Sequence, residues 1–170
     1  MHLRELTHTD YAQFVALREY ALKEYPASFS AANEEEQADR KHKFNSLVSH
    51  RVNFILGAFV GEMLVGMVGF MQLSRKKISH KGELTAMIVS AAYQGQGIGY
   101  ALLQHALEKA FLIEDIHQIN LVVNEDRKSA IALYKKVGFV PYGLEKNAIR
   151  VEGKMHTAIH MVKRSSSSQH

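Results

Sequence analysis

Apolar residues change their spacing along the chain, and these changes divide it into short strands and amphipathic helices. Residues 2–6 predict a short first strand. Apolar residues three and four positions apart then predict a helix, which Thr9 or Asp10 can cap and which Pro26 ends. Residues 30–50 are polar and predict one more helix with an exposed face.

The most apolar stretch, residues 53–73, is nearly long enough to imitate a membrane span. Its interruption at Gly61 and Glu62, between two apolar runs of strand length, favours a β-hairpin instead. A further strand follows over residues 82–89, and a glycine-rich junction then leads into an amphipathic helix over residues 97–111.

The last third of the chain shows the same two spacings. An apolar run over residues 117–124 predicts a buried strand, and residues 126–137 predict a second amphipathic helix that closes at Gly138. We expect the remaining strands to be separated by Gly143 and by residues 152–153.

The order of these elements indicates the fold class. It runs strand, two helices, three strands, helix, strand, helix and then strands, which indicates an α/β fold in which an antiparallel meander feeds a strand-helix-strand unit. At 170 residues the chain is long enough for one packed domain and short for two. We therefore predict a single domain over residues 1–163 and a low-complexity, disordered tail over residues 164–170.

The content of cysteine and histidine bears on metal binding. The chain has no cysteine, which excludes disulfides, thiolate metal sites and cysteine nucleophiles. Among its ten histidines, His156 and His160 would share one face of a strand, but no third ligand is evident beside them. We expect no metal.

Charge bears on partners and location. The formal net charge of +4 favours anionic partners in general, but it falls well short of what a nucleic-acid-binding protein carries. The N-terminal residues include acidic side chains where a secretory signal needs an unbroken apolar stretch. We expect a cytoplasmic protein with neither a nucleic-acid nor a membrane partner.

The junction at residues 93–103 carries three glycines in five positions. Glycines there let backbone N–H groups approach a ligand, and the first N–H groups of a helix bind anions such as phosphate. Two nucleotide motifs fail here. The P-loop needs a Gly-Lys-Ser/Thr sequence that is absent, and the dinucleotide motif needs a glycine where this chain has Tyr100.

The pattern that does fit is Gln94-x-x-Gly97-x-Gly99 directly after a strand. A second block follows, formed by Asn124 and by the sequence SAIALYKKVGF at residues 129–139. With both blocks at this separation, the chain resembles the GCN5-related N-acetyltransferase (GNAT) family.

The resemblance implies a mixed, mostly antiparallel sheet of six to seven strands, flanked by about four helices and splayed at the central strand that carries the cofactor. It implies acetyl-CoA as the cosubstrate and no metal. The acceptor would be a primary amine of a small molecule, peptide or protein, which attacks the thioester directly in a ternary complex. Homodimers are common in such proteins, and this point is left open here.

The resemblance also implies where the cofactor lies. The pantetheine would pair with the strand, the diphosphate would rest on the loop and helix N–H groups, and Gln94 would shape the loop. The implied cofactor-binding residues are Met87, Ile88, Val89, Gln94, Gly95, Gln96, Gly97, Ile98, Gly99, Tyr100, Asn124 and Ser129. A larger side chain at Gly97 or Gly99 would stand where the phosphates need to be. Turn formation by Asn124 and helix capping by Ser129 are the alternatives.

Two residues are implied for catalysis. Tyr134 matches the family tyrosine whose hydroxyl donates toward the leaving sulfur, and an ordinary core tyrosine is the alternative. Glu83 opens the cofactor strand and would take the amine proton through a water chain, unless it is a solvated strand end. A backbone N–H near Ile88 would polarise the thioester carbonyl.

Two other functions stay open, and the acceptor is not identified. One is a CoA-binding sensor or interaction module of the same fold that has lost catalysis, and the other is a nucleotide-binding domain of another fold. In the GNAT family the acceptor groove is built from the N-terminal helices and the last strands, here about residues 23–40 and 141–157. The acidic run at residues 34–36 would attract a cationic amine without identifying it.

Overall fold

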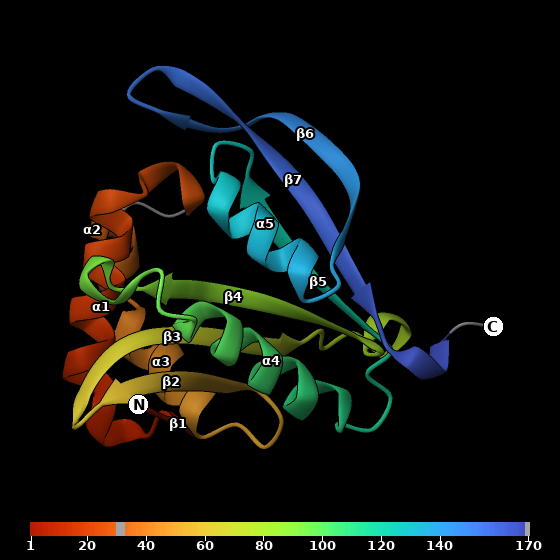
Figure 1. The fold of residues 1–170 in the computed structure, drawn as a ribbon, viewed down its shortest axis with the longest axis horizontal. Helices are drawn as coiled ribbons and strands as arrows, with labels where there is room; N and C mark the ends of the chain where they lie inside the picture. The colour runs from red at the N-terminus through yellow and green to blue at the C-terminus, as the bar shows by residue number, and fades with distance from the viewer. Residues whose placement is uncertain (30–32, 169–170) are drawn as a thin grey trace.

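The computed structural model describes residues 1–29 and 33–168, which fold around one seven-stranded sheet (Figure 1). Its strand order is β1-β2-β3-β4-β5-β7-β6, and every neighbouring pair is antiparallel except β4 with β5. The strands are β1 (His2–Glu5), β2 (Phe54–Val60), β3 (Met63–Gln72), β4 (Lys81–Val89), β5 (Gln118–Asn124), β6 (Val140–Val151) and β7 (Lys154–Arg164). The mixed, mostly antiparallel sheet is as predicted.

Five α-helices flank the sheet in the described part of the chain. They are α1 (Tyr11–Glu24), α2 (Asn33–Gln37), α3 (Arg40–Val48), α4 (Ile98–Phe111) and α5 (Lys128–Lys136). The prediction of one helix over residues 30–50 is wrong, because the backbone leaves the helical conformation at Asp39 (φ −123°, ψ 1°) and separates α2 from α3. Residues 30–32 of that prediction lie outside the described residues.

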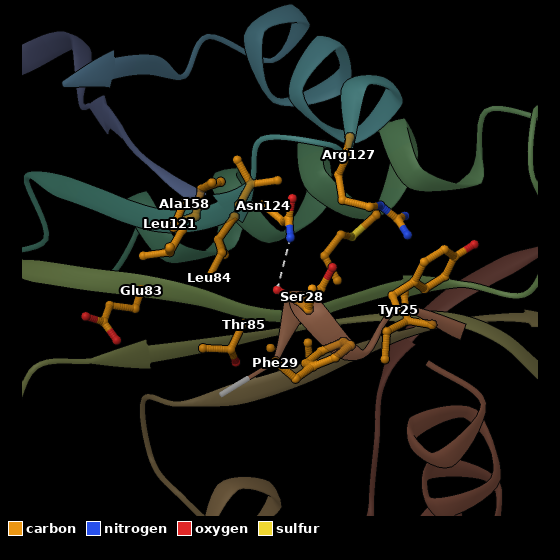
Figure 2. Close-up of a pocket in the computed structure, with 18 of the residues that line it drawn as sticks. Tyr25, Ser28, Phe29, Glu83, Leu84, Thr85, Leu121, Asn124, Arg127 and Ala158 are labelled. Atoms are coloured by element: carbon orange, nitrogen blue, oxygen red, sulfur yellow. Dashed lines mark hydrogen bonds between the residues drawn. The ribbon is translucent and has the colours of Figure 1, made fainter. Parts of the chain in front are cut away.

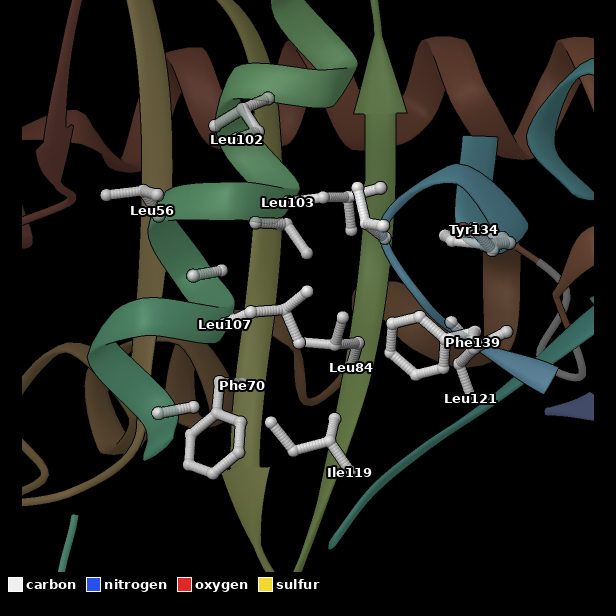
Figure 3. Close-up of a cluster of buried hydrophobic side chains, with 14 of the residues drawn as sticks. Leu56, Phe70, Leu84, Leu102, Leu103, Leu107, Ile119, Leu121, Tyr134 and Phe139 are labelled. Atoms are coloured by element: carbon white, nitrogen blue, oxygen red, sulfur yellow. The ribbon is translucent and has the colours of Figure 1, made fainter. Parts of the chain in front are cut away.

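Helices cover both faces of the sheet (Figure 1). On one face, Leu102, Leu103 and Leu107 of α4 pack in the same cluster as Phe70 of β3 and Leu84 of β4 (Figure 3). On the other face, α1 and α3 bury a second set of side chains against β2 and β3, which includes Phe14, Leu17, Phe44, Ile55, Phe59 and Met67. The central strands are therefore buried on both faces.

This double burial explains the long apolar stretch. Successive side chains of a strand point to opposite faces, so strands covered on both sides are apolar throughout. The predicted hairpin is formed by β2 and β3, and Gly61 in its two-residue turn has a left-handed φ of +59°. None of the described helices combines the length and the apolarity that a membrane crossing requires.

β4 diverges from β5 partway along the sheet. The two strands pair over three residues only, and the last pair is Glu83 with Asn120. On its other side β4 is bulged, because the register with β3 shifts between Thr85 and Ile88, where Ala86 has a φ of +51°. The predicted splay is present, and beyond Glu83 no strand within residues 1–29 and 33–168 pairs with the edge of β4 that faces β5.

The C-terminal strands differ from the prediction at one point. β6 runs through Gly143 without a break, because the glycine lies at a register shift against β7 and not at a strand boundary. The predicted turn at residues 152–153 is present, with positive φ at both positions. At the predicted disordered tail, Ser166–Ser168 forms a short 3-10 helix, and residues 169–170 lie outside the described residues.

Candidate active site

The splay between β4 and β5 opens a cavity of about 760 Å³. Its walls are β4, the end of β5 and the first turns of α5, and the short 3-10 helix Pro26–Ser28 lies across it (Figure 2). Residues of α1 and α3 line one side of it, and residues of β6 and β7 line the other. The cavity thus joins the segments predicted for the cofactor to those predicted for the acceptor.

The glycine loop, residues 94–97, connects β4 to α4 at the edge of this cavity. Gly95 and Gly97 have φ values of +76° and +80°, which residues other than glycine rarely adopt. Apart from the adjacent residues in the chain, a Cβ built on either glycine would meet no atom of the described residues within 4 Å, so the space beside the loop is open. Gly97 is the N-cap of α4, and the first N–H groups of that helix have no partner within the helix.

The other three predicted residues at this helix start are held by the fold. Gly99 faces the protein, because a Cβ there would lie 3.0 Å from Leu133 and 3.2 Å from Met87. The prediction that a Gly99 side chain would collide with phosphates is therefore corrected: it would collide with these two side chains. Ile98 is buried in the core, and the Tyr100 hydroxyl accepts a hydrogen bond from Gln104 at 2.8 Å.

The two glutamines of the motif have different partners. Gln94 Nε2 donates to the carbonyl oxygen of Val89 at 2.9 Å and to the hydroxyl of Tyr25 at 3.3 Å. Gln96 is exposed and donates to the carbonyl oxygen of Ala92 at 3.3 Å. Gln94 therefore bridges the turn after β4, whereas Gln96 makes one local contact.

The β4 residues predicted to bind the cofactor, Met87, Ile88 and Val89, all line the cavity. Ile88 pairs with Met67 of β3, and its side chain is buried in the core cluster under α1. Because β4 has no partner on its β5 side here, backbone groups on that edge face the cavity. The carbonyl oxygen of Val89 is the exception, since Gln94 already donates to it.

The structure separates the two predicted residues near the start of α5. Asn124 is buried in the cavity wall, where its Oδ1 accepts from the Asp126 N–H at 2.8 Å and its Nδ2 donates to the Ala27 carbonyl at 3.3 Å (Figure 2). These bonds form the turn after β5 and hold it to the Pro26–Ser28 helix. Ser129 is exposed on α5 and does not line the cavity.

Tyr134 lies on the buried face of α5, where it lines the cavity and packs edge-on against Phe139 at 6.0 Å between ring centroids. Burial raises the pKa of Tyr134 to about 12, and the positive charge of Arg127 opposes part of that rise. In the described part of the chain its hydroxyl has no hydrogen-bond partner. A protonated phenol is therefore available to a ligand in the cavity.

Glu83 and Glu36 both line the cavity, but only Glu83 is without an ion-pair partner in the described part of the chain. Glu36 accepts two hydrogen bonds from Arg18 at 2.9 Å each, and a third from Arg40 at 3.2 Å. The predicted acidic run is thus partly neutralised, because these partners hold the Glu36 carboxylate. Burial alone would raise the pKa of Glu36, but the two guanidinium groups lower it.

Sequence reasoning missed the contact between Tyr25 and Arg127 in the cavity wall. The guanidinium carbon of Arg127 lies 3.5 Å from the centroid of the Tyr25 ring. The hydrogen bond from Gln94 lowers the pKa of Tyr25, and Tyr20 and Arg127 lower it further. Arg127 lies between Asn124 and residues 129–139, the two parts of the second block, and this position was a signal, whereas nothing in the sequence around Tyr25 indicated the contact.

The two histidines considered as metal ligands lie on β7 beside carboxylates. His160 Nε2 is 2.9 Å from Glu145 Oε2, and His156 Nδ1 is 3.7 Å from Asp126 Oδ2. Over residues 1–29 and 33–168, no group of three or more side chains is arranged to hold a metal ion.

Three known proteins show what this chain is similar to. The N-alpha-acetyltransferase RimI of Mycobacterium tuberculosis is 36% identical over 110 residues, which are 65% of this chain and 66% of RimI. A solved structure of an acetyltransferase of the GNAT family from Streptococcus pneumoniae has a TM-score of 0.85 and 26% identity over 96% of this chain and 99% of its own. The chain covers less than two thirds of the length of RimI.

The third is a phosphinothricin acetyltransferase from Sinorhizobium meliloti in complex with AcCoA. It has a TM-score of 0.88 over 99% of this chain and 90% of its own, and at 18% identity the likeness concerns the fold. Because residues 14–139, well over half of the chain, match the acetyltransferase (GNAT) family, the chain belongs to that family.

Proposed function

We propose that the protein is an N-acetyltransferase that transfers the acetyl group of acetyl-CoA to a primary amine of a small molecule, peptide or protein, by direct attack in a ternary complex. The observation that carries the proposal is the unpaired edge of β4 beside the open glycine loop. In a member of this family, the two features suit an extended cofactor with phosphates at one end.

The residues that would hold the cofactor fit it in two ways. The free edge of β4 at Met87 and Ile88 offers backbone groups to the pantetheine amides, as it would to an added strand. The open space beside Gly95 and Gly97 admits phosphate oxygens to the first N–H groups of α4. When bound, acetyl-CoA supplies an acyl group that is activated as a thioester.

Tyr134 is the proposed donor toward the leaving sulfur. Its pKa of about 12 keeps the phenol protonated at neutral pH. A thiol has an ordinary pKa of about 8.5, so complete release of the Tyr134 proton to a thiolate is unfavourable. Tyr134 is thus best suited to stabilise the departing sulfur with a hydrogen bond.

Glu83 is the proposed base that takes the proton of the amine through water. Support comes from its place in the cavity wall and from its carboxylate, which has no partner among the described residues, whereas the other lining carboxylates, Glu36 and Glu145, have partners. An ammonium must lose its proton before it can attack, and an unpaired carboxylate in the wall also attracts the cationic acceptor.

The alternative is a CoA-binding module of this fold without catalysis. The presence of Tyr134 in the wall of the same cavity as the β4 edge favours the enzyme. A cytoplasmic location and a homodimer stay predictions.

A turnover screen tests the proposal. Released CoA thiol is measured with acetyl-CoA and a panel of amino acids, peptides, polyamines and antibiotics that carry amines. We expect turnover with at least one class and stabilisation against heat by acetyl-CoA. Preferential stabilisation by ATP or NAD would overturn the acetyl-CoA assignment, and tight acetyl-CoA binding without turnover for any amine would favour the inactive module.

A further inference from the structure

One charged side chain near each end of the cavity lacks a salt bridge to any described residue. Glu36 is paired with Arg18 and Arg40, and Lys43 with Asp39. Glu145 is hydrogen-bonded to His160 at 2.9 Å and His156 lies 3.7 Å from Asp126, and these two contacts are ion pairs only when the imidazole is protonated. In the part of the chain that the structure describes, Glu83 and Arg127 have no ion-pair partner. Figure 2 shows these two side chains at opposite ends of the residues drawn.

The guanidinium of Arg127 is placed without an acceptor for one of its nitrogens. Its carbon atom lies 3.5 Å from the centroid of the Tyr25 ring, and Nη1 is buried with no hydrogen-bond partner among the described residues. A buried cationic N–H without an acceptor is unfavourable, because it has lost its hydrogen bonds to water and the contact with the Tyr25 ring replaces only part of them. An anionic oxygen from a ligand would remove this penalty.

The guanidinium stands at the glycine-loop end of the cavity. The hydroxyl of Tyr25, the residue under Arg127, accepts a hydrogen bond from Gln94 of the glycine loop. The loop itself offers only backbone N–H groups, and the helix start behind it is equivalent to about half an elementary charge. Arg127 contacts Tyr25, and Tyr25 contacts Gln94, so two contacts connect the guanidinium to the glycine loop. Among the described residues that line the cavity, Arg127 is the positively charged side chain without a salt bridge.

We propose that Arg127 and the glycine loop together form an oxyanion subsite, in which Arg127 binds a phosphate group of acetyl-CoA. This inference rests on the proposed function. The guanidinium, which belongs to a partly exposed residue, donates to a phosphate oxygen, and its full charge adds to the partial charges of the loop N–H groups. Arg127 is then a cofactor-binding residue that the motif itself does not contain.

A carboxylate on the acceptor is the other source of the same chemistry. Arg127 also lines a second cavity of about 360 Å³, between the Pro26–Ser28 helix and the turn at residues 152–153. His156 lines both cavities, and its Nδ1 is likewise buried without a hydrogen-bond partner among the described residues. The contact through Tyr25 to Gln94 favours phosphate, and the experiment separates the two sources.

The experiment compares two ligands and four variants. Dissociation constants are measured by calorimetry for acetyl-CoA and for S-acetylpantetheine, which has no phosphate. The variants are Arg127→Met, Arg127→Gln, Arg127→Lys and the control Lys128→Met, which removes a neighbouring charge that lines neither cavity. Thermal unfolding checks that each variant is folded. If Arg127→Met does not fold, Arg127→Gln is used as the neutral variant in its place.

We expect the neutral Arg127 variants to weaken acetyl-CoA binding about 10- to 100-fold, with S-acetylpantetheine affected less than about 3-fold. Arg127→Lys should keep much of the affinity, and Lys128→Met should change it little. The affinity of the neutral variants should also depend less steeply on salt than that of the wild type.

Two results would overturn the phosphate assignment: unchanged acetyl-CoA affinity, or equal weakening of both ligands. If acetyl-CoA affinity is unchanged while the preference for amino acids over their amides is lost in kcat/KM, the anion is the acceptor carboxylate. If the wild type binds no acetyl-CoA, the proposed function fails, and this inference fails with it. If the wild type binds acetyl-CoA and acetylates an amine, and the Arg127 variants do so equally well, only the inference about Arg127 is refuted.

Discussion

The carbonyl oxygen of Val89 accepts a hydrogen bond from the side chain of Gln94 at 2.9 Å. The last carbonyl group of β4 is thereby satisfied inside the chain, and Gln94 is fixed across the turn that leads to the glycine loop. The free edge of β4 accordingly lies upstream, at Met87 and Ile88. The Gln94 side chain therefore determines where the free edge of β4 ends and fixes the start of the glycine loop.

Replacing Gln94 by alanine should weaken acetyl-CoA binding about 5- to 20-fold, because the loop loses two hydrogen bonds worth about 1 kcal/mol each. Gln96→Ala is the matched control, since Gln96 is exposed and makes one local bond to Ala92. Calorimetric titration with acetyl-CoA measures both. Equal losses in the two variants would mean that the Gln94 contacts do not order the loop.

Replacing Gly97 by alanine should cost about 1–2 kcal/mol of stability, because its φ of +80° is strained for any residue with a Cβ. Gly153→Ala in the β6–β7 turn is the control, with the same φ and equally open space around it. Chemical denaturation should show similar losses in both variants, and only Gly97→Ala should lose acetyl-CoA affinity. If Gly153→Ala loses as much affinity, the loss reflects strain and not contact with the ligand.

The sequence predicted the parts of the fold and site that local spacing determines. The glycine loop, the hairpin of β2 and β3, and the place of Tyr134 on the buried face of α5 all follow from patterns within a few residues. Gln94 was expected to shape the loop, and its bond to Val89 spans only five positions. Constraints between residues a few positions apart can be predicted from the sequence.

Contacts between distant segments could not be predicted in this way. The ion pair of Arg18 with Glu36, the contact of Arg127 with Tyr25, and the packing of Gly99 against Leu133 each join separate elements. Their geometry depends on how helices and strands pack, which no spacing within one element encodes. Ser129 shows the converse, since its place in a motif block does not bring it into the cavity.

Asp10→Asn should lower the free energy of unfolding at pH 7 by about 1–2 kcal/mol, a figure reduced for the partial exposure of Arg4. Arg4 donates two hydrogen bonds to Asp10 at 2.8 Å each and, with the Thr7 N–H, lowers the pKa of Asp10 to about 2. A lowered pKa stabilises the fold above the ordinary pKa of 3.8, and this stability is lost as the pH falls toward 2.

Denaturant titrations between pH 7 and pH 2 check this expectation. The gap between wild type and Asp10→Asn should narrow below about pH 4, because Asp10 is then increasingly protonated in the unfolded state and, toward pH 2, also in the folded state. Asp39→Asn is the control, since Asp39 forms an exposed pair with Lys43 at 3.5 Å and should change stability by less than about 0.5 kcal/mol. A gap that stays constant to pH 2 would show that the Asp10 charge is not what stabilises the fold.

Tyr134→Phe should lower kcat about 100-fold or more with a small change in KM, because it removes a donor that acts as the sulfur departs. Stability should change little, since the hydroxyl has no hydrogen-bond partner among the described residues. With a pKa of about 12, Tyr134 should stay protonated up to about pH 10, so its ionisation should cause no loss of kcat below that pH. Unchanged turnover for every accepted amine would remove the assigned role.

Glu83→Gln should lower kcat/KM about 100-fold or more, because the variant can neither take the amine proton nor attract the ammonium form of the acceptor. The dependence of kcat/KM on pH should differ between the variant and the wild type. Glu62→Gln is the control, since Glu62 lies in the exposed turn between β2 and β3 and lines neither cavity. Acetyl-CoA affinity should be unchanged in both, because Glu83 acts on the acceptor. A variant that keeps the wild-type pH profile would place the base elsewhere, and a loss of acetyl-CoA affinity would mean that Glu83 supports the cofactor strand.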